Sequence, residues 1–105
     1  MIDESTLERA MDYLSDTDVE CAALKADVHR SEYLAKVAEA LAFQLAEGSI
    51  EAKKAEAKRV TTVQDAWEKH FSAMQAYEIV RAKRERAVLT VEVWRSMNAN
   101  RRQAA

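Results

Sequence analysis

The stretch Leu45-Ala46-Glu47-Gly48-Ser49-Ile50-Glu51 decides how this chain folds, because it holds the only glycine among 105 residues. A glycine just after the last apolar position of a helix is a common stop, since it adopts left-handed backbone at no steric cost. Ser49 then offers a side-chain oxygen that can cap a new helix. The stretch predicts that one helix ends before Gly48 and another begins after it.

Little else in the sequence interrupts a helix. Proline is absent and 49% of the residues are apolar, with alanine prominent, which favours helix throughout. Ser5 with Glu8, and Thr62 with Asp65, have the spacing of capping boxes, in which a side chain and a backbone N–H satisfy each other. The predicted helices are about 5–47, a short one about 49–59, and about 62–100.

Apolar residues recur every three or four positions on both long helices, as on a buried helical face. Polar side chains from Ser15 to Asp18 compete for backbone hydrogen bonds, so a kink or a second helix start can form there. The predicted stripes are Leu7, Ala10/Met11, Leu14, Cys21, Leu24, Val28, Leu34/Ala35, Ala38, Leu41/Ala42 and Leu45, and then Val63, Ala66/Trp67, His70/Phe71, Ala73/Met74, Tyr77, Val80, Ala87/Val88, Val91, Trp94 and Met97/Asn98. The fold class is therefore all-α. We expect a coiled-coil-like antiparallel hairpin of two long helices with a short connecting helix, forming one domain over residues 1–105.

The stripes are wider than one partner helix can cover. Trp67, Phe71, Leu89 and Trp94 are spread around the circumference of the last helix, which indicates packing against a second helical pair. A lone domain of this size also buries only a thin core. The sequence therefore predicts a homo-oligomer, at least a dimer.

Charge is divided unevenly between the two halves of the chain. Residues 1–51 hold 12 acidic and 4 basic side chains, a net charge of −8, whereas residues 52–105 hold 6 acidic and 12 basic side chains, a net charge of +6. In an antiparallel hairpin the two halves neutralise each other; alternatively, the basic half is a binding surface.

The sequence predicts a cytoplasmic protein. Cys21 is the only cysteine, which excludes an internal disulfide and a cysteine-based zinc cage. The first residues are acidic and no apolar run follows them, so no signal peptide is expected. No stretch approaches the roughly 18 consecutive apolar residues of a membrane span, and no membrane partner is expected.

No catalytic or metal-binding group is predicted. His29 and Glu32 are one helical turn apart, but they make only half of a di-metal set, and Glu68 and His70 point to different faces. Cys21 lies on the apolar stripe, where a buried thiol is unreactive. A single glycine cannot build a phosphate-binding loop. We therefore expect no enzyme activity, no cofactor, no metal and no small-molecule substrate.

The strongest candidate for a site is the basic end of the last helix. Residues 81–102 hold seven basic and two acidic side chains with tryptophan and asparagine among them, a mixture that suits nucleic acid and also protein interfaces. Otherwise the segment is a solvated face with Trp94 packed in the core. The predicted partner-binding residues are Arg84, Trp94, Arg95, Asn98, Arg101 and Arg102.

Three segments resemble small all-helical accessory proteins of tailed bacteriophages: Tyr13–Asp18, Glu47–Ala55 and Glu92–Arg102. The resemblance covers most of the chain and implies a viral protein made in the bacterial cytoplasm, near phage recombination or replication functions. It implies no catalytic residue.

These observations favour a non-enzymatic accessory or adaptor protein that self-associates and docks on a protein or nucleic-acid partner through its basic C-terminal helix. One alternative is a purely structural coiled-coil spacer. Another is a stoichiometric inhibitor of a host enzyme, acting through acidic residues of the first helix: Asp12, Asp16, Asp18, Glu20 and Asp27.

Overall fold

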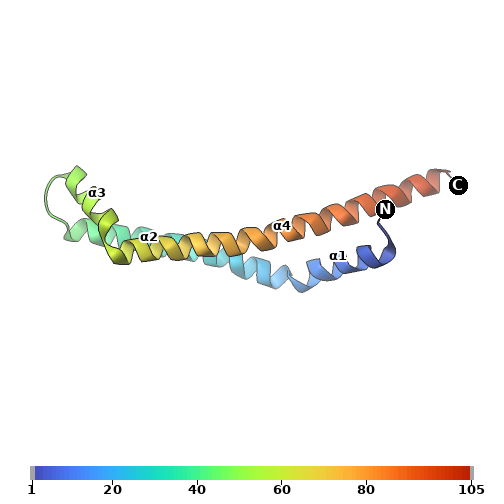
Figure 1. Cartoon of the computed structure of the whole chain (residues 1–105), viewed down its shortest axis with the longest axis horizontal. Helices are drawn as coiled ribbons and strands as arrows, with labels where there is room; N and C mark the ends of the chain where they lie inside the picture. Colours follow the sequence, from blue (N-terminus) through green and yellow to red (C-terminus); the bar gives the residue numbers. More distant parts are fainter. Residues whose placement is uncertain (1, 105) are drawn as a thin grey trace. The chain divides into compact units, whose positions relative to one another are not determined.

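The computed structural model describes residues 2–104, and helices account for almost all of them. They form α1 (Glu4–Asp16), α2 (Asp18–Leu45), α3 (Ile50–Arg59) and α4 (Thr61–Ala104), shown in Figure 1. No strand occurs in this part of the chain. The prediction of an all-α protein is confirmed.

The first predicted helix is divided in two at Thr17. The Thr17 N–H and hydroxyl both donate to the carbonyl oxygen of Tyr13, at 3.0 and 2.6 Å. The Thr17 N–H keeps its helical bond, and the hydroxyl adds a second donor to the same carbonyl, a side-chain contact that often bends helices. The break therefore forms inside the predicted helix of residues 5–47.

The start of α1 differs from the prediction, because Asp3 caps it in place of Ser5. The Asp3 carboxylate accepts a hydrogen bond from the Thr6 N–H at 2.7 Å, and this bond lowers the pKa of Asp3 below its ordinary value of 3.8. A carboxylate satisfies an orphan N–H and also opposes the positive end of the helix. Ser5 lies within the first turn.

The turn around Gly48 forms as predicted. α2 ends at Leu45, Gly48 has a φ of +109°, and Ser49 caps α3 by accepting a hydrogen bond from the Ala52 N–H at 3.2 Å. Gly48 is the one described residue with a positive φ. Its lack of a Cβ is what allows the chain to turn here.

Replacing Gly48 by alanine is expected to lower the free energy of unfolding by about 1–3 kcal/mol, because an L-residue is strained at this φ. The added Cβ would also lie 3.2 Å from the Cβ of Ala52. Urea unfolding followed by circular dichroism measures the loss. Glu47→Ala, at the exposed neighbouring position, should change stability by less than about 0.5 kcal/mol. A Gly48→Ala protein as stable as the wild type would contradict this role of the turn.

The start of α4 also differs from the prediction, since the helix begins at Thr61 and Thr62 is already inside it. Val60 has extended backbone, and its carbonyl accepts from the N–H groups of Val63 and Gln64, each at 3.1 Å. The backbone of Val60 thus opens the helix, so a capping box at Thr62 is wrong. α4 extends to Ala104, beyond the predicted end near residue 100.

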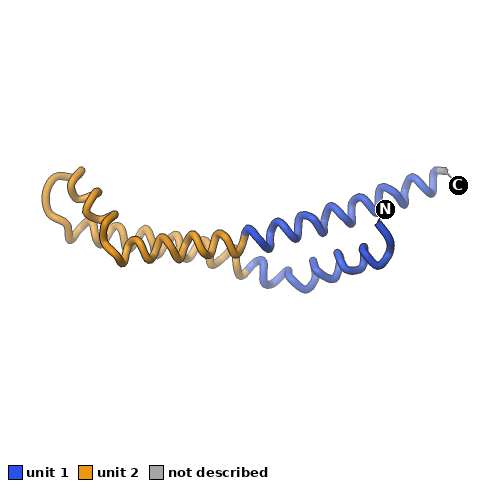
Figure 2. The backbone as a smooth tube through the Cα atoms, in the orientation of Figure 1, with its two compact units in different colours: residues 1–22, 78–105 blue, residues 23–77 orange. Residues whose placement is uncertain are grey.

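The described chain clusters into two compact units (Figure 2). Unit 1 comprises residues 1–22 and 78–105, in which α1 lies beside the second half of α4. Unit 2 comprises residues 23–77, in which most of α2 lies beside the first half of α4 and α3 joins their ends. A single domain over residues 1–105 stays a prediction.

Each unit has a core of very small side chains. The buried apolar residues of the described chain are Ala10 and Ala87 in unit 1, and Ala35, Ala57 and Val63 in unit 2. Cys21, which was predicted to be core, is only half-buried. Several large residues of the predicted inward stripes are exposed: Leu34, Leu41, Leu45, Phe71, Met74 and Val88. The most deeply buried apolar residues are thus mainly alanines, while several large apolar side chains stay uncovered.

Candidate partner-binding surface

The six predicted partner-binding residues all lie on the second half of α4, in unit 1. The structure gives them different surroundings. Arg95, Arg101 and Arg102 are exposed, whereas Trp94 and Asn98 are half-buried. Arg84 is also half-buried and is held by neighbours within the unit.

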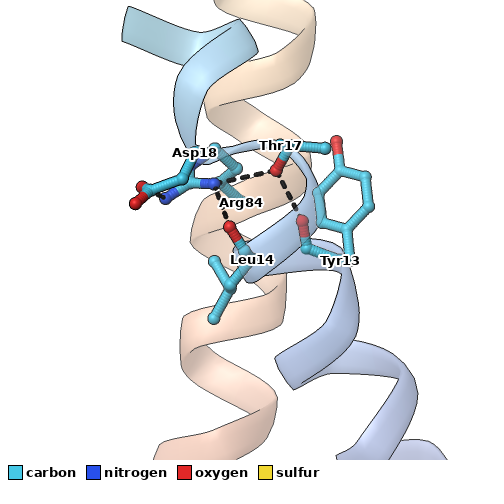
Figure 3. Close-up of polar contacts among 5 residues, drawn as sticks. All are labelled: Tyr13, Leu14, Thr17, Asp18 and Arg84. Carbon is cyan, nitrogen blue, oxygen red and sulfur yellow. Dashed lines mark hydrogen bonds and ion pairs between the residues drawn. The ribbon is translucent and has the colours of Figure 1, made fainter.

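Arg84 binds the chain at the break between α1 and α2. Figure 3 shows its guanidinium next to the Leu14 carbonyl, the Thr17 hydroxyl and the Asp18 carboxylate. Nη1 donates to the Leu14 oxygen at 2.7 Å and to Thr17 Oγ1 at 2.8 Å, and Nη2 donates to Asp18 Oδ1 at 2.9 Å. The cation thus satisfies a carbonyl at the end of α1 and meets an acidic residue in the first turn of α2.

This arrangement gives Arg84 a structural role that was not predicted. Its guanidinium donates three hydrogen bonds within unit 1, and its side chain is only 20% exposed. Thr17, one of its acceptors, is buried. Arg84 therefore stabilises the break in the helix, and partner binding by Arg84 stays a prediction, as it does for the other five residues.

Those five residues occupy two neighbouring lines along α4. Trp94, Asn98 and Arg101 are spaced by four and three residues, which places them on one line of a helix. Arg95 and Arg102 are seven residues apart, two turns, and form the adjacent line. None of the three arginines makes an ion pair with a residue that the structure describes. We call these five residues the C-terminal surface.

A second basic feature of unit 1 was not predicted. α1 and α4 border an open groove of about 380 Å³. Arg9, Lys83 and Arg86 are exposed along it, and the buried Ala10 and Ala87 also line it. The remaining lining residues are Thr6, Tyr13 and Thr90. No carboxylate is among the residues that line the groove. We call this feature the basic groove.

The charge pattern gave no indication of the basic groove. Arg9 belongs to the acidic half of the sequence, where it is one of four basic residues. Lys83 and Arg86, 74 and 77 positions further on, are one helical turn apart. The fold brings all three cations to the same groove, although the two halves differ in net charge.

The acidic residues proposed for enzyme inhibition are all exposed. Asp18 forms an ion pair with Arg84, and Asp27 forms one with Arg30 at 2.7 Å. Both pairs reduce the negative charge that these residues present. The inhibitor hypothesis stays a prediction, with Asp12, Asp16 and Glu20 as its unpaired members among the described residues.

Unit 2 contains a serine and a histidine in hydrogen-bond contact, which the sequence analysis did not find. Ser31 Oγ lies 3.1 Å from His70 Nδ1 and donates to the Val28 carbonyl at 3.0 Å. His70 is buried, and its ring meets the ring of Trp67 edge-on with centroids 5.7 Å apart. His29 lies exposed elsewhere on α2.

The direction of these hydrogen bonds gives the Ser31–His70 pair a structural role. The hydroxyl carries a single proton and the Val28 carbonyl can only accept, so Ser31 Oγ accepts from the Nδ1–H of His70. A general base would need the opposite direction, with the serine proton on the imidazole. The pair links α2 to α4 across the core of unit 2.

Within the described residues, no group of three or more histidine, cysteine, aspartate or glutamate side chains is placed to hold a metal ion. None of the helices in residues 2–104 combines the length and the apolar character needed to cross a membrane. A comparison of the chain with protein-family models, curated proteins and solved structures finds no match.

Proposed function

We propose that this protein is a non-enzymatic helical accessory protein of the cytoplasm, which self-associates and holds a partner on the C-terminal surface. In this proposal the chain is an antiparallel helical hairpin, coiled-coil-like in packing, and a second copy covers the apolar face of unit 2. The resemblance to phage proteins is the basis for proposing a setting in DNA recombination or replication.

One observation carries the proposal: the apolar face of α2 lies uncovered. Leu34, Val37, Leu41 and Leu45 follow one another at spacings of three and four residues, and so lie on one side of the helix. Their exposed fractions range from 36% to 85%. We call these four residues the α2 stripe. A stripe of this kind in water is typical of an interaction surface.

A second copy of this chain can cover the α2 stripe. A stable dimer needs about 800 Å² from each partner. Twofold pairing of identical stripes buries such a surface without a further component.

The core composition supports the same conclusion. Four of the five buried apolar residues in the described chain are alanines, and alanine contributes little apolar area. Fully burying a leucine side chain contributes about 1.5–3 kcal/mol. Association through the α2 stripe therefore adds the hydrophobic stabilisation that the separate chain lacks.

The dependence of thermal stability on concentration tests this proposal. If the folded chains associate, mass action stabilises them by about 1.4 kcal/mol per dimer for each tenfold rise in concentration. We expect the Tm, followed by circular dichroism, to rise by a few degrees for each tenfold step. A Tm that does not change with concentration would contradict self-association.

A further inference from the structure

We propose that the basic groove binds the phosphate backbone of single-stranded nucleic acid, with Arg9, Lys83 and Arg86 as the phosphate-binding residues. This inference goes beyond the proposed function, because it gives unit 1 a ligand and a site distinct from the C-terminal surface. It does not depend on self-association through the α2 stripe.

The charge of the groove favours a polyanion. Arg9, Lys83 and Arg86 are exposed, and none makes an ion pair with a described residue. In contrast, Arg84 and Arg81, on the same segment of α4, are bound to carboxylates. No carboxylate is among the residues that line the groove. The Asp3 carboxylate interacts electrostatically with Arg9, so Lys83, Arg86 and part of the Arg9 charge are left for an anion. Each phosphate that they contact would release condensed counterions.

The polar groups of the groove suit phosphate oxygens and a base. The Arg9 guanidinium donates to Thr6 Oγ1 at 3.4 Å, which leaves its other N–H groups available. Tyr13 is half-buried and lines the same groove. Its ring can stack on a base and its hydroxyl can donate to phosphate, a combination found in proteins that bind single strands.

The shape of the groove favours a chain over a small ligand. The groove is open to solvent, with the small side chains of Ala10 and Ala87 among its lining residues. Lys83, Arg86 and Thr90 also follow one line of α4, by steps of three and four residues. From Lys83 to Thr90 this line spans about 10 Å of helix, so an extended strand can lie along it within the groove.

Fluorescence anisotropy with a labelled oligothymidylate of about 20 nucleotides tests the inference. If three phosphates are neutralised, the affinity of the wild-type protein should fall about 20-fold between 50 and 200 mM salt. The variant Arg9→Gln/Lys83→Gln/Arg86→Gln should lower the slope of log affinity against log salt by about 2. Glutamine is a good helix former, and circular dichroism checks that the variant keeps its helix content.

A matched variant controls for net charge. Lys25, Lys54 and Lys69 are exposed residues of unit 2 that make no ion pair with described residues. Replacing all three by glutamine removes the same charge, and this variant should keep the wild-type salt slope. An equal loss of affinity in both triple variants would overturn the inference, because it would show a response to net charge alone.

Two further outcomes would also overturn it. In the first, Arg95→Gln/Arg101→Gln/Arg102→Gln abolishes binding while the groove variant binds normally, which would place the nucleic acid on the C-terminal surface and leave the proposed function standing. In the second, polyglutamate binds and the oligonucleotide does not, which would make the groove a site for an acidic protein. Neither result changes the mass or the Tm on which self-association is judged.

Discussion

Replacing Leu41 by lysine is expected to weaken self-association about 10- to 150-fold. Leu41 is 55% exposed in the single chain, so covering it contributes about half of the 1.5–3 kcal/mol of a fully buried leucine, and a twofold interface loses that contribution from both copies. A total loss of about 1.5–3 kcal/mol corresponds to roughly a 10- to 150-fold change in Kd. Lysine also brings a charge into a surface that excludes water. Sedimentation velocity over a range of concentrations measures the change.

Ile79→Lys is the matched control for Leu41→Lys. The two side chains have similar exposure, 49% and 55%, but Ile79 belongs to unit 1 and to none of the predicted apolar stripes. Substitution of an exposed residue outside an interface changes stability by less than about 0.5 kcal/mol. We expect Ile79→Lys to associate like the wild type. Equal association of all three proteins would show that the α2 stripe is not the interface.

Replacing Arg84 by methionine is expected to lower the free energy of unfolding by about 2–3 kcal/mol. Methionine keeps much of the apolar stem but donates no hydrogen bond, so the Leu14 carbonyl and the Thr17 hydroxyl lose a charged donor. A hydrogen bond to a charged group contributes about 1.5–3 kcal/mol. The Asp18 carboxylate is 76% exposed, so its ion pair adds less than about 1 kcal/mol. Urea unfolding measures the total.

Hydrogen exchange locates the effect of Arg84→Met. The amides of residues 14–21 should lose protection first, because they flank the break that Arg84 stabilises. Arg95→Met is the control, since Arg95 is exposed and makes no ion pair with described residues. It should change stability by less than about 0.5 kcal/mol. If Arg84→Met had the unfolding free energy and the exchange pattern of the wild type, the hydrogen bonds of Arg84 would not be what stabilises the break.

Local signals predicted the helices well and their starts less well. Gly48 and Ser49 act through their own backbone and side chain, so the sequence alone identifies that turn. At the two other predicted starts, the helix begins earlier than the capping boxes indicated. The Asp3 carboxylate caps α1 in place of Ser5, and the backbone of Val60 begins α4 one turn before Gln64. Alternative caps differ in stability by about 1 kcal/mol. The spacing of a capping box cannot resolve so small a difference.

Contacts between residues far apart in the sequence were not predicted, for a different reason. Each of them depends on the register between two helices: Arg84 with Leu14, Ser31 with His70, and Arg9 beside Lys83 in one groove. Apolar periodicity gives the face of each helix but not that register, because a wide stripe of alanines and leucines packs in several ways. The basic groove was missed for this reason.

Burial was the least predictable feature of the stripes. Leu34 and Leu41 have the periodicity of core residues, yet they are exposed in the single chain. Periodicity shows that a face avoids water, and it does not show whether the covering helix belongs to the same chain or to another copy. The width of the stripes was the signal that pointed to another copy.

Sedimentation equilibrium of the wild-type protein tests the central claim most directly, because it measures mass independently of shape. Self-association through the α2 stripe predicts a mass of at least twice 11.9 kDa at high concentration, falling toward the single-chain value on dilution or in Leu41→Lys. A mass of 11.9 kDa at every concentration, with the helix content intact, would contradict the claim.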